Sequence, residues 1–281
     1  MPPRSITDFT AAPSEANQWP LWTEDLRLDD ALADNAYETT PPSWRAAIKT
    51  GLALAHLHFG QHTGKRWSAT DETQAGFWAR DCEMPAPWVI IAFTPAYDAA
   101  ARLAAACIPA ILAGVPLIAA VCVDGTPQKS VLVSLELTGI EDIFLLDQKA
   151  LCTLLQEMLP HTGRLVALHT GELRPVLQVA QHIGLRCFEE NHPPALSLPQ
   201  PECFDPELLA FAHGKTALTT SHNNQQPEAV YLPNPAEACE ATPFQTHEAF
   251  LTIMPGCEGF WLHHSLTPQF FRLHHHAFAL R

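Results

Sequence analysis

Histidine is the residue type with the most chemical potential in this chain, because fifteen histidines stand among 281 residues with a net charge of −14. Three groups are closely spaced: His56, His58 and His62; His263 and His264; and His274, His275 and His276. On a helix, His58 and His62 would lie on one face and could together bind zinc. No acidic residue or cysteine stands at ligand spacing nearby, so the alternative is solvated histidines that interact with the end of a helix dipole.

A second candidate for chemistry is the run Glu189-Glu190-Asn191-His192, which follows a predicted helix and precedes two prolines. Glu190 and His192 could exchange protons as an acid–base pair, and we take them as candidate catalytic residues. The alternative is a polar loop between a helix and a strand.

A third candidate is Asp124-Gly125-Thr126, which follows a nearly continuous apolar run. These residues would lie at the carboxyl end of a strand, where α/β folds bind ligands, so we take them as candidate cofactor-binding residues. The segment has one glycine and no GxGxxG pattern, so a simple turn is the alternative.

The elements that would position these residues are clearest in the middle of the chain. Residues 115–123 are nearly all apolar, which is typical of a parallel strand covered on both faces. A helix is predicted over 129–137 and a second strand over 140–146, and the preceding helix ends at Gly114. The pattern predicts a βαβ unit with a right-handed crossover.

The same alternation continues on both sides and predicts an α/β protein with a Rossmann-like, doubly wound, mostly parallel sheet over 88–204. Residues 1–40 are interpreted as an N-terminal arm and 41–87 as a helical lead-in. Residues 205–281 are expected to form a second, small α/β segment that ends in a docking helix.

Composition excludes some classes of function. The 16 basic residues are scattered in an acidic chain, which argues against nucleic-acid binding. No uninterrupted apolar run reaches about 18 residues, and the N-terminus lacks a basic segment followed by an apolar one, so we expect a cytoplasmic protein without a membrane partner. The eight cysteines form no CxxC and are interpreted as buried thiols.

Several segments resemble histidinol dehydrogenase, a zinc and NAD enzyme related distantly to aldehyde dehydrogenases. The sequence AAIKTGLALAHLHFGQ is similar to that family's N-terminal helix, and residues 108–146 are similar to its PAxxAGVxxI region. Arg164-Leu-Val is placed like the strand before its GPGN loop, and residues 193–198 like its GPSEVLV strand. The final HHHAFALR matches its H-x-x-A-x-x-L-R ending, with His274 at the position of a zinc ligand.

This resemblance implies zinc and NAD as cofactors, a small-molecule ligand and a homodimer of intertwined subunits. His213 and His274 are the metal-ligand candidates that it leaves. The other motifs differ: Asp147-Gln-Lys-Ala150 replaces GGAQA, Leu168-His-Thr-Gly171 replaces GPGN, and Phe211 stands where the QAEH helix has its Gln. Two zinc ligands of four would hold the ion weakly.

We therefore expect a shortened, divergent relative that has lost zinc-dependent histidinol oxidation and keeps a crevice for a small molecule or nucleotide. One alternative is an active NAD-dependent oxidoreductase for an alcohol or aldehyde, with zinc held by His213, His274 and either His263 or His264. The other is a non-catalytic protein whose termini hold an assembly together.

Overall fold

A five-stranded parallel sheet forms the centre of the protein, whose computed structural model describes residues 18–60, 64, 66–72, 76–159, 162–215, 217, 227–234 and 249–280. Its strands are β3 (Trp88–Phe93), β4 (Leu117–Val123), β5 (Asp142–Leu146), β6 (Arg164–Leu168) and β7 (Arg186–Glu190). They pair in the order β5-β4-β3-β6-β7, so the chain winds outward from β3 in both directions. This topology confirms the predicted Rossmann-like, doubly wound α/β fold.

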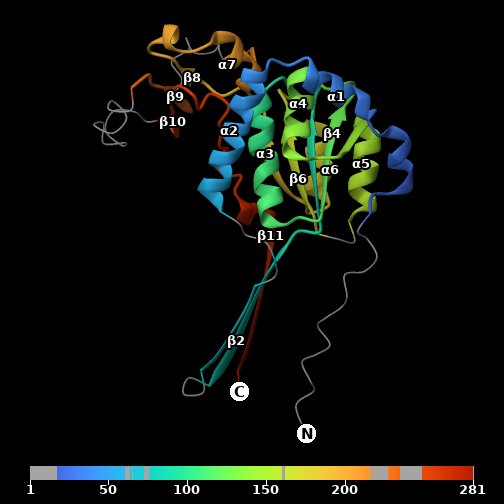
Figure 1. The fold of residues 1–281 in the computed structure, drawn as a ribbon. Helices are drawn as coiled ribbons and strands as arrows, with labels where there is room; N and C mark the ends of the chain where they lie inside the picture. Colours follow the sequence, from blue (N-terminus) through green and yellow to red (C-terminus); the bar gives the residue numbers. More distant parts are fainter. Residues whose placement is uncertain are drawn as a thin grey trace.

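Helices cover both faces of the sheet (Figure 1). On one face lie α3 (Ala100–Ala113) and α4 (Lys129–Thr138), with α1 (Asp30–Glu38) packed on α4 and α2 (Pro42–Phe59) packed on α3. On the other lie α5 (Gln148–Glu157) and α6 (Arg174–His182). Because both faces are covered, every residue of β3 is buried, which explains the unbroken apolar runs in the sequence.

The described part of the N-terminal arm packs against the edge of the central sheet. Residues 18–40 contain a 3-10 helix, η2 (Leu21–Leu26), followed by α1. The buried Trp19 donates a hydrogen bond from Nε1 to Asp142 Oδ2 at 2.7 Å. Arg27 forms an ion pair with the same carboxylate at 2.9 Å. This stretch of the predicted arm therefore belongs to the α/β unit, while residues 1–17 lie outside the described residues.

Two predictions about this central region are wrong. The charged run Glu189-Glu190 is not a loop, because both residues end β7, an edge strand whose partial exposure weakens its apolar pattern. The short strand at 196–198 does not join the central sheet. It forms β8 (Leu196–Ser197), which pairs with β9 (Ala229–Tyr231) and, through it, β10 (Leu251–Ile253) in a second parallel sheet.

That second sheet lies beside α2 and α3, together with η3 (Pro201–Cys203) and α7 (Pro206–His213). Its buried residues share one apolar cluster with α3, in which Tyr231, Trp261 and Leu209 are almost fully enclosed. This packing places α7 close to the beginning of α3. Among the described residues, no helix is both long and apolar enough to cross a membrane.

A third sheet projects away from the α/β unit (Figure 1). It is antiparallel, with β1 (Arg66–Glu72), β2 (Phe77–Pro85) and β11 (Arg272–Leu280) in the order β1-β2-β11. The predicted C-terminal docking helix is therefore wrong, because nine residues of β11 pair with β2, which satisfies the backbone groups on that side of the strand. The expected lead-in over 41–87 is likewise helical only through Phe59. The segment η5 (Pro268–Phe271) connects β11 to the core.

Candidate functional site

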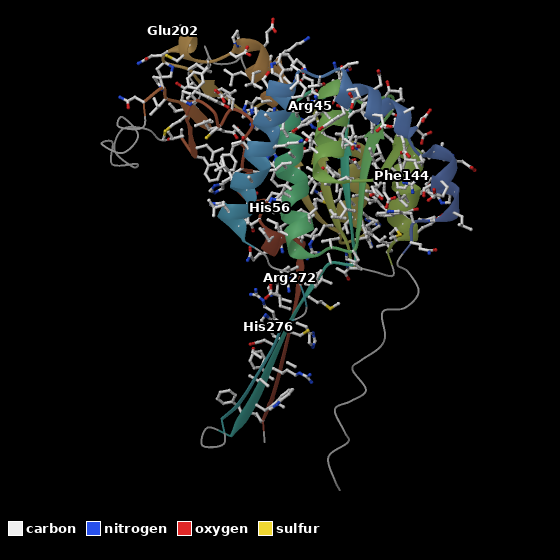
Figure 2. The ribbon with its side chains drawn as sticks, in the orientation of Figure 1. Arg45, His56, Phe144, Glu202, Arg272 and His276 are labelled. Atoms are coloured by element: carbon white, nitrogen blue, oxygen red, sulfur yellow. The ribbon has the colours of Figure 1, made fainter. Side chains whose placement is uncertain are left out.

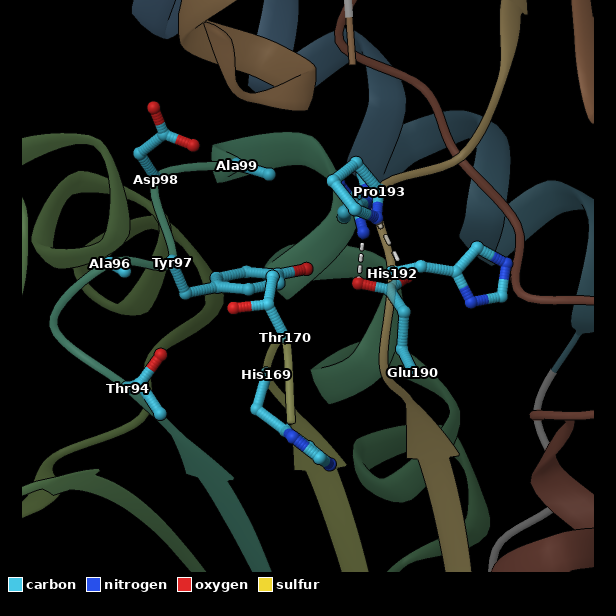
Figure 3. A pocket seen from close by; sticks show the side chains of 11 residues that line it. Thr94, Ala96, Tyr97, Asp98, Ala99, His169, Thr170, Glu190, His192 and Pro193 are labelled. Atoms are coloured by element: carbon cyan, nitrogen blue, oxygen red, sulfur yellow. Dashed lines mark hydrogen bonds and ion pairs between the residues drawn. The ribbon is translucent and has the colours of Figure 1, made fainter. Parts of the chain in front are cut away.

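A small polar cavity lies where the strand order reverses, at the carboxyl ends of β3, β6 and β7. Its volume is about 30 Å³. The loop after β3 contributes Thr94 and Tyr97, and α3 contributes Arg102. His169 follows β6, and Glu190 ends β7 (Figure 3). This is the edge at which doubly wound sheets bind their ligands.

Arg102 and Glu190 form a buried ion pair beside this cavity. Arg102 is 4% exposed within the otherwise apolar α3, and its Nη2 contacts Glu190 Oε1. Its Nε donates to Glu190 Oε2 at 3.3 Å, and its Nη1 donates to the carbonyl of His213 at 3.1 Å. Burial alone would raise the pKa of the Glu190 carboxyl, but Arg102 and His263 outweigh it and lower the pKa to about 2. Glu190 is therefore ionised at neutral pH.

His263 completes the ion pair from a distant part of the chain. Its Nε2 lies 2.9 Å from the backbone oxygen of Arg102, and its Nδ1 lies 3.2 Å from Glu190 Oε2. A carbonyl and a carboxylate are both acceptors, so both ring nitrogens of His263 face acceptors. The three side chains thus form a closed network in which the Glu190 carboxylate balances the charge of Arg102.

His169 has its tautomer fixed by the backbone. Its Nδ1 accepts hydrogen bonds from the amides of Gly171 at 2.7 Å and Leu173 at 3.4 Å, so the hydrogen of a neutral ring is on Nε2. Burial lowers the pKa of His169, against the opposing influence of Glu189 and Glu172. His169 is therefore a neutral hydrogen-bond donor at the cavity.

Three of the side chains that line the cavity each carry a buried polar atom that makes no well-formed hydrogen bond within the described residues. These atoms are Thr94 Oγ1, Tyr97 Oη and His169 Nε2, and the last of them lies 3.3 Å from Glu189 Oε1. Burial and the Glu190 carboxylate raise the pKa of Tyr97 well above its ordinary value, so its hydroxyl keeps its hydrogen. Unpartnered buried polar groups are costly, and the cavity has room for about two water-sized groups that could satisfy them.

The two predicted catalytic residues both line this cavity, but they have different surroundings. Glu190 is held by Arg102 and His263, whereas the side chain of His192 is 70% exposed and contacts Asn191 Oδ1 at 2.7 Å. An acid–base pair of Glu190 and His192 stays a prediction. Sequence reasoning missed Arg102, whose signal was a single charged residue inside an apolar helix.

The predicted cofactor-binding residues lie at the same edge of the sheet without lining the cavity. Asp124 has a positive φ of 62°, and its carboxylate accepts a hydrogen bond from Gln148 at 2.8 Å. A Cβ at Gly125 would lie 2.6 Å from Cγ of Pro95, so the loop packs tightly on the loop after β3. This packing gives Gly125 a structural role. Such a role agrees with the alternative interpretation of Asp124-Gly125-Thr126 as a simple turn.

The start of α3 does not fit the pyrophosphate of NAD. In dinucleotide-binding folds this group sits at the N-terminus of the first crossover helix, against glycines. Here the loop from Thr94 to Ala99 has no glycine, and Ala100 is fully buried. The Asp98 carboxylate accepts a hydrogen bond from the amide of Lys215 at 3.3 Å, so negative charge and the segment after α7 occupy this helix end.

The two predicted metal ligands, His213 and His274, lie on different elements of the fold, α7 and β11. His213 is buried on α7, where its Nε2 lies 2.8 Å from the carbonyl of Glu258 and 2.6 Å from Tyr231 Oη. Burial lowers the pKa of His213 to about 3, so the ring is neutral. His274 stands on β11, opposite Glu83, in the sheet that projects away from α7 (Figures 1 and 2).

The residues present therefore do not fit a zinc ion in one chain. Within the part of the chain that the structure describes, no group of three or more His, Cys, Asp or Glu side chains could hold a metal. His263 of the predicted alternative is engaged with Glu190 and Arg102. A zinc ion shared by His213 and His274 would need one histidine from each of two copies.

Comparison with known proteins agrees with the fold class defined by this sheet. No protein-family model matches the sequence, and no curated protein matches it. Among solved structures, the chain is similar to histidinol dehydrogenase from Elizabethkingia anophelis, with 14% identity, a TM-score of 0.54 and coverage of 92% of this chain and 77% of that one. The resemblance found in the sequence is thus confirmed for the fold, and identity this low shows nothing further.

Two aldehyde dehydrogenases also match at lower scores. Succinate-semialdehyde dehydrogenase from Burkholderia pseudomallei has 14% identity over 77% of this chain, with a TM-score of 0.38. Aldehyde dehydrogenase from Brucella melitensis biovar abortus 2308 has 15% identity over 76%, with a TM-score of 0.35. The chain spans 44% and 56% of these two proteins, and at such TM-scores they add nothing to the assignment.

Proposed function

We propose that this protein keeps the fold of histidinol dehydrogenase without zinc-dependent histidinol oxidation, and that it binds a small polar molecule at the carboxyl edge of its central sheet. The observation that carries the proposal is the buried network of Arg102, Glu190 and His263. It occupies the place where the strand order reverses and leaves a cavity lined by three buried polar atoms that make no well-formed hydrogen bond.

The protonation states of the buried groups support a binding role over an oxidising one. A general base works best when its pKa lies near the operating pH. The pKa of Glu190 is about 2 and that of His213 about 3, so neither group would accept a proton readily at neutral pH. The N-terminus of α3 is covered by the segment after α7, which also disfavours binding of NAD+, the cofactor that would accept the hydride.

The proposal is tested by titrating the native protein with NAD+ in a calorimeter and by following NAD+ reduction with histidinol and other amino alcohols. We expect neither binding in the micromolar to millimolar range nor turnover. Saturable NAD+ binding with histidinol-dependent reduction would overturn the proposal and favour the active oxidoreductase.

We also propose that the β1-β2-β11 sheet joins two copies into a homodimer. Its two edge strands have no further partner strand within the described residues, and Phe278 and Leu280 on β11 are 73% and 89% exposed. Small sheets need a packed face for stability, and open apolar edges favour pairing with another chain. A second copy of the chain would supply both the packed face and the pairing strand.

Size-exclusion chromatography with light scattering tests this assembly. Leu280→Lys places a charge on the edge strand and should shift the protein toward monomer. Leu57→Lys is the matched control, because Leu57 is 82% exposed on α2 and lies outside the sheet. A dimer that survives the first change, or one that both changes weaken equally, would contradict the proposed interface. The cytoplasmic location stays a prediction that cell fractionation can check.

A further inference from the structure

A larger cavity lies at the opposite, amino edge of the central sheet, where the β1-β2-β11 sheet leaves the domain. Its volume is about 600 Å³. Arg164, the first residue of β6, and Arg186, the first residue of β7, line it together with Arg272, His274 and His275 from β11. Because β6 and β7 are parallel, this cavity and the one beside Glu190 lie at opposite ends of the same strands.

The cavity is cationic although the protein as a whole carries a net charge of −14. No aspartate or glutamate is among its lining residues. Arg272 forms an ion pair with the neighbouring Glu83. Within the described residues, Arg164 and Arg186 form no ion pair with a carboxylate, so two positive charges stand unbalanced at one cavity.

Arg164 is held firmly without being neutralised. It is 4% exposed, and its three nitrogens donate to the carbonyls of Phe270 at 2.6 Å, Gly163 at 2.9 Å and Arg272 at 2.9 Å. A guanidinium has five N–H groups, so this side chain keeps two further donors. Burial and the charge of Arg186 lower the pKa of Arg164 to about 10, which means that its positive charge is disfavoured where it stands.

Arg186 is positioned by an aromatic ring. Its guanidinium carbon lies 5.1 Å from the centre of the Phe270 ring, a cation–π distance, and Arg164 lies 5.9 Å from the same ring. The two guanidinium groups therefore lie beside one phenyl ring, and Arg164 is also held by its three carbonyl contacts. Groups that are already in place lose little conformational freedom when they bind a ligand.

We propose that this cavity binds a small molecule through a phosphate group, held by Arg164 and Arg186. Two unbalanced guanidinium groups match the charge of a phosphate dianion, and their planar forks can each contact two of its oxygens. The cavity is much larger than a phosphate and falls within the range of small-molecule sites, so the ligand is a phosphate ester. His274 and His275 line the side where its organic part would lie.

The test uses the native protein with inorganic phosphate and glycerol 3-phosphate as probes. Thermal unfolding and calorimetric titration are run at constant ionic strength, with chloride replacing phosphate in the reference. We expect a saturable rise in Tm with phosphate and a larger one with the ester, because a ligand that binds the folded state stabilises it.

Two exposed arginines provide a matched comparison. Arg186→Gln removes one cavity charge and should weaken phosphate binding by roughly 10-fold, the usual effect of losing a charged hydrogen bond. Arg174→Gln makes the same change on α6, outside the cavity, and should weaken it by less than about 2-fold through the loss of one distant charge. A phosphate effect no larger than that of chloride, or equal losses in both variants, would overturn the proposal. The outcome is independent of the site beside Glu190.

Discussion

Replacing Glu190 with Gln should destabilise the protein strongly, because it leaves Arg102 buried without a balancing carboxylate. The pKa of Glu190 lies at about 2 instead of the ordinary 4.5, and at 1.36 kcal/mol per pKa unit this corresponds to about 3 kcal/mol of folding free energy. Breaking a buried ion pair by removing one partner typically costs about 3 to 5 kcal/mol. At about 2 to 4 °C per kcal/mol for a chain near this size, Tm should fall by about 10 °C.

The assay is chemical and thermal unfolding at pH 7, followed by circular dichroism, with the adjacent residue as control. Glu189→Gln removes the same charge from a half-exposed side chain whose Oε1 lies 3.3 Å from His169 Nε2 and accepts a hydrogen bond from Asn191 Nδ2 at 3.2 Å, and it should cost less than about 1 kcal/mol. In the double variant with Arg102→Met, the loss should be smaller than the sum of the two single losses. A Glu190→Gln protein within about 1 kcal/mol of wild type would refute the assigned role of the network.

The pH dependence of this variant has a definite sign. The folded-state pKa of Glu190 is depressed, so its contribution is fully present above pH 4.5 and is lost as the pH falls toward 2. The stability difference between wild type and Glu190→Gln should therefore be largest near neutral pH and shrink below pH 4.5. A difference that stays constant over this range would contradict the ionised state of the carboxyl.

Two further predictions follow from buried groups elsewhere. Burial lowers the pKa of His213 from 6.5 to about 3, so the wild-type protein should lose stability as the pH falls from 6.5 to 3. In unfolding experiments, His213→Gln should reduce the slope of stability against pH by up to about 1.4 kcal/mol per pH unit. An unchanged slope would contradict the burial of His213 as a neutral ring. Trp19→Phe removes the hydrogen bond to Asp142 and should lower the free energy of unfolding by about 1 to 2 kcal/mol. Trp22→Phe removes an exposed contact with Glu157 and should lower it by less than about 0.5 kcal/mol. Equal losses in the two variants would contradict a stabilising role for the hydrogen bond from Trp19 to Asp142.

The parts of the fold that could be predicted from the sequence are those with strong local patterns. Strands β3, β4 and β6 are largely buried on both faces, so their residues are apolar apart from Arg164 at the start of β6. Strand β7 lies at the edge of the sheet, and its residues are exposed or half-buried without regular alternation, so its sequence has the polarity of a loop. Strand β11 depends on pairing with β2, for which the local sequence gives no signal.

The candidate site was predictable only in part, because its contacts join residues that are far apart in the sequence. Glu190 stood out as part of a charged run beside a predicted strand, but its partners come from far along the chain. Arg102 is 88 residues away from it, and the contact between Arg102 and His263 spans 161 residues. Local spacing could suggest a metal site for the clustered histidines, whereas the folded chain uses His263 in an ion-pair network.

Zinc content of the native, untagged protein after dialysis against a weak chelator tests the central claim most directly. If the zinc-dependent activity is lost, the folded protein should contain well below one zinc ion per chain. The zinc content of His274→Ala should be the same as that of wild type. About one zinc per chain, released by His274→Ala, would contradict the account and restore the zinc-dependent dehydrogenase, with ligands contributed by two copies.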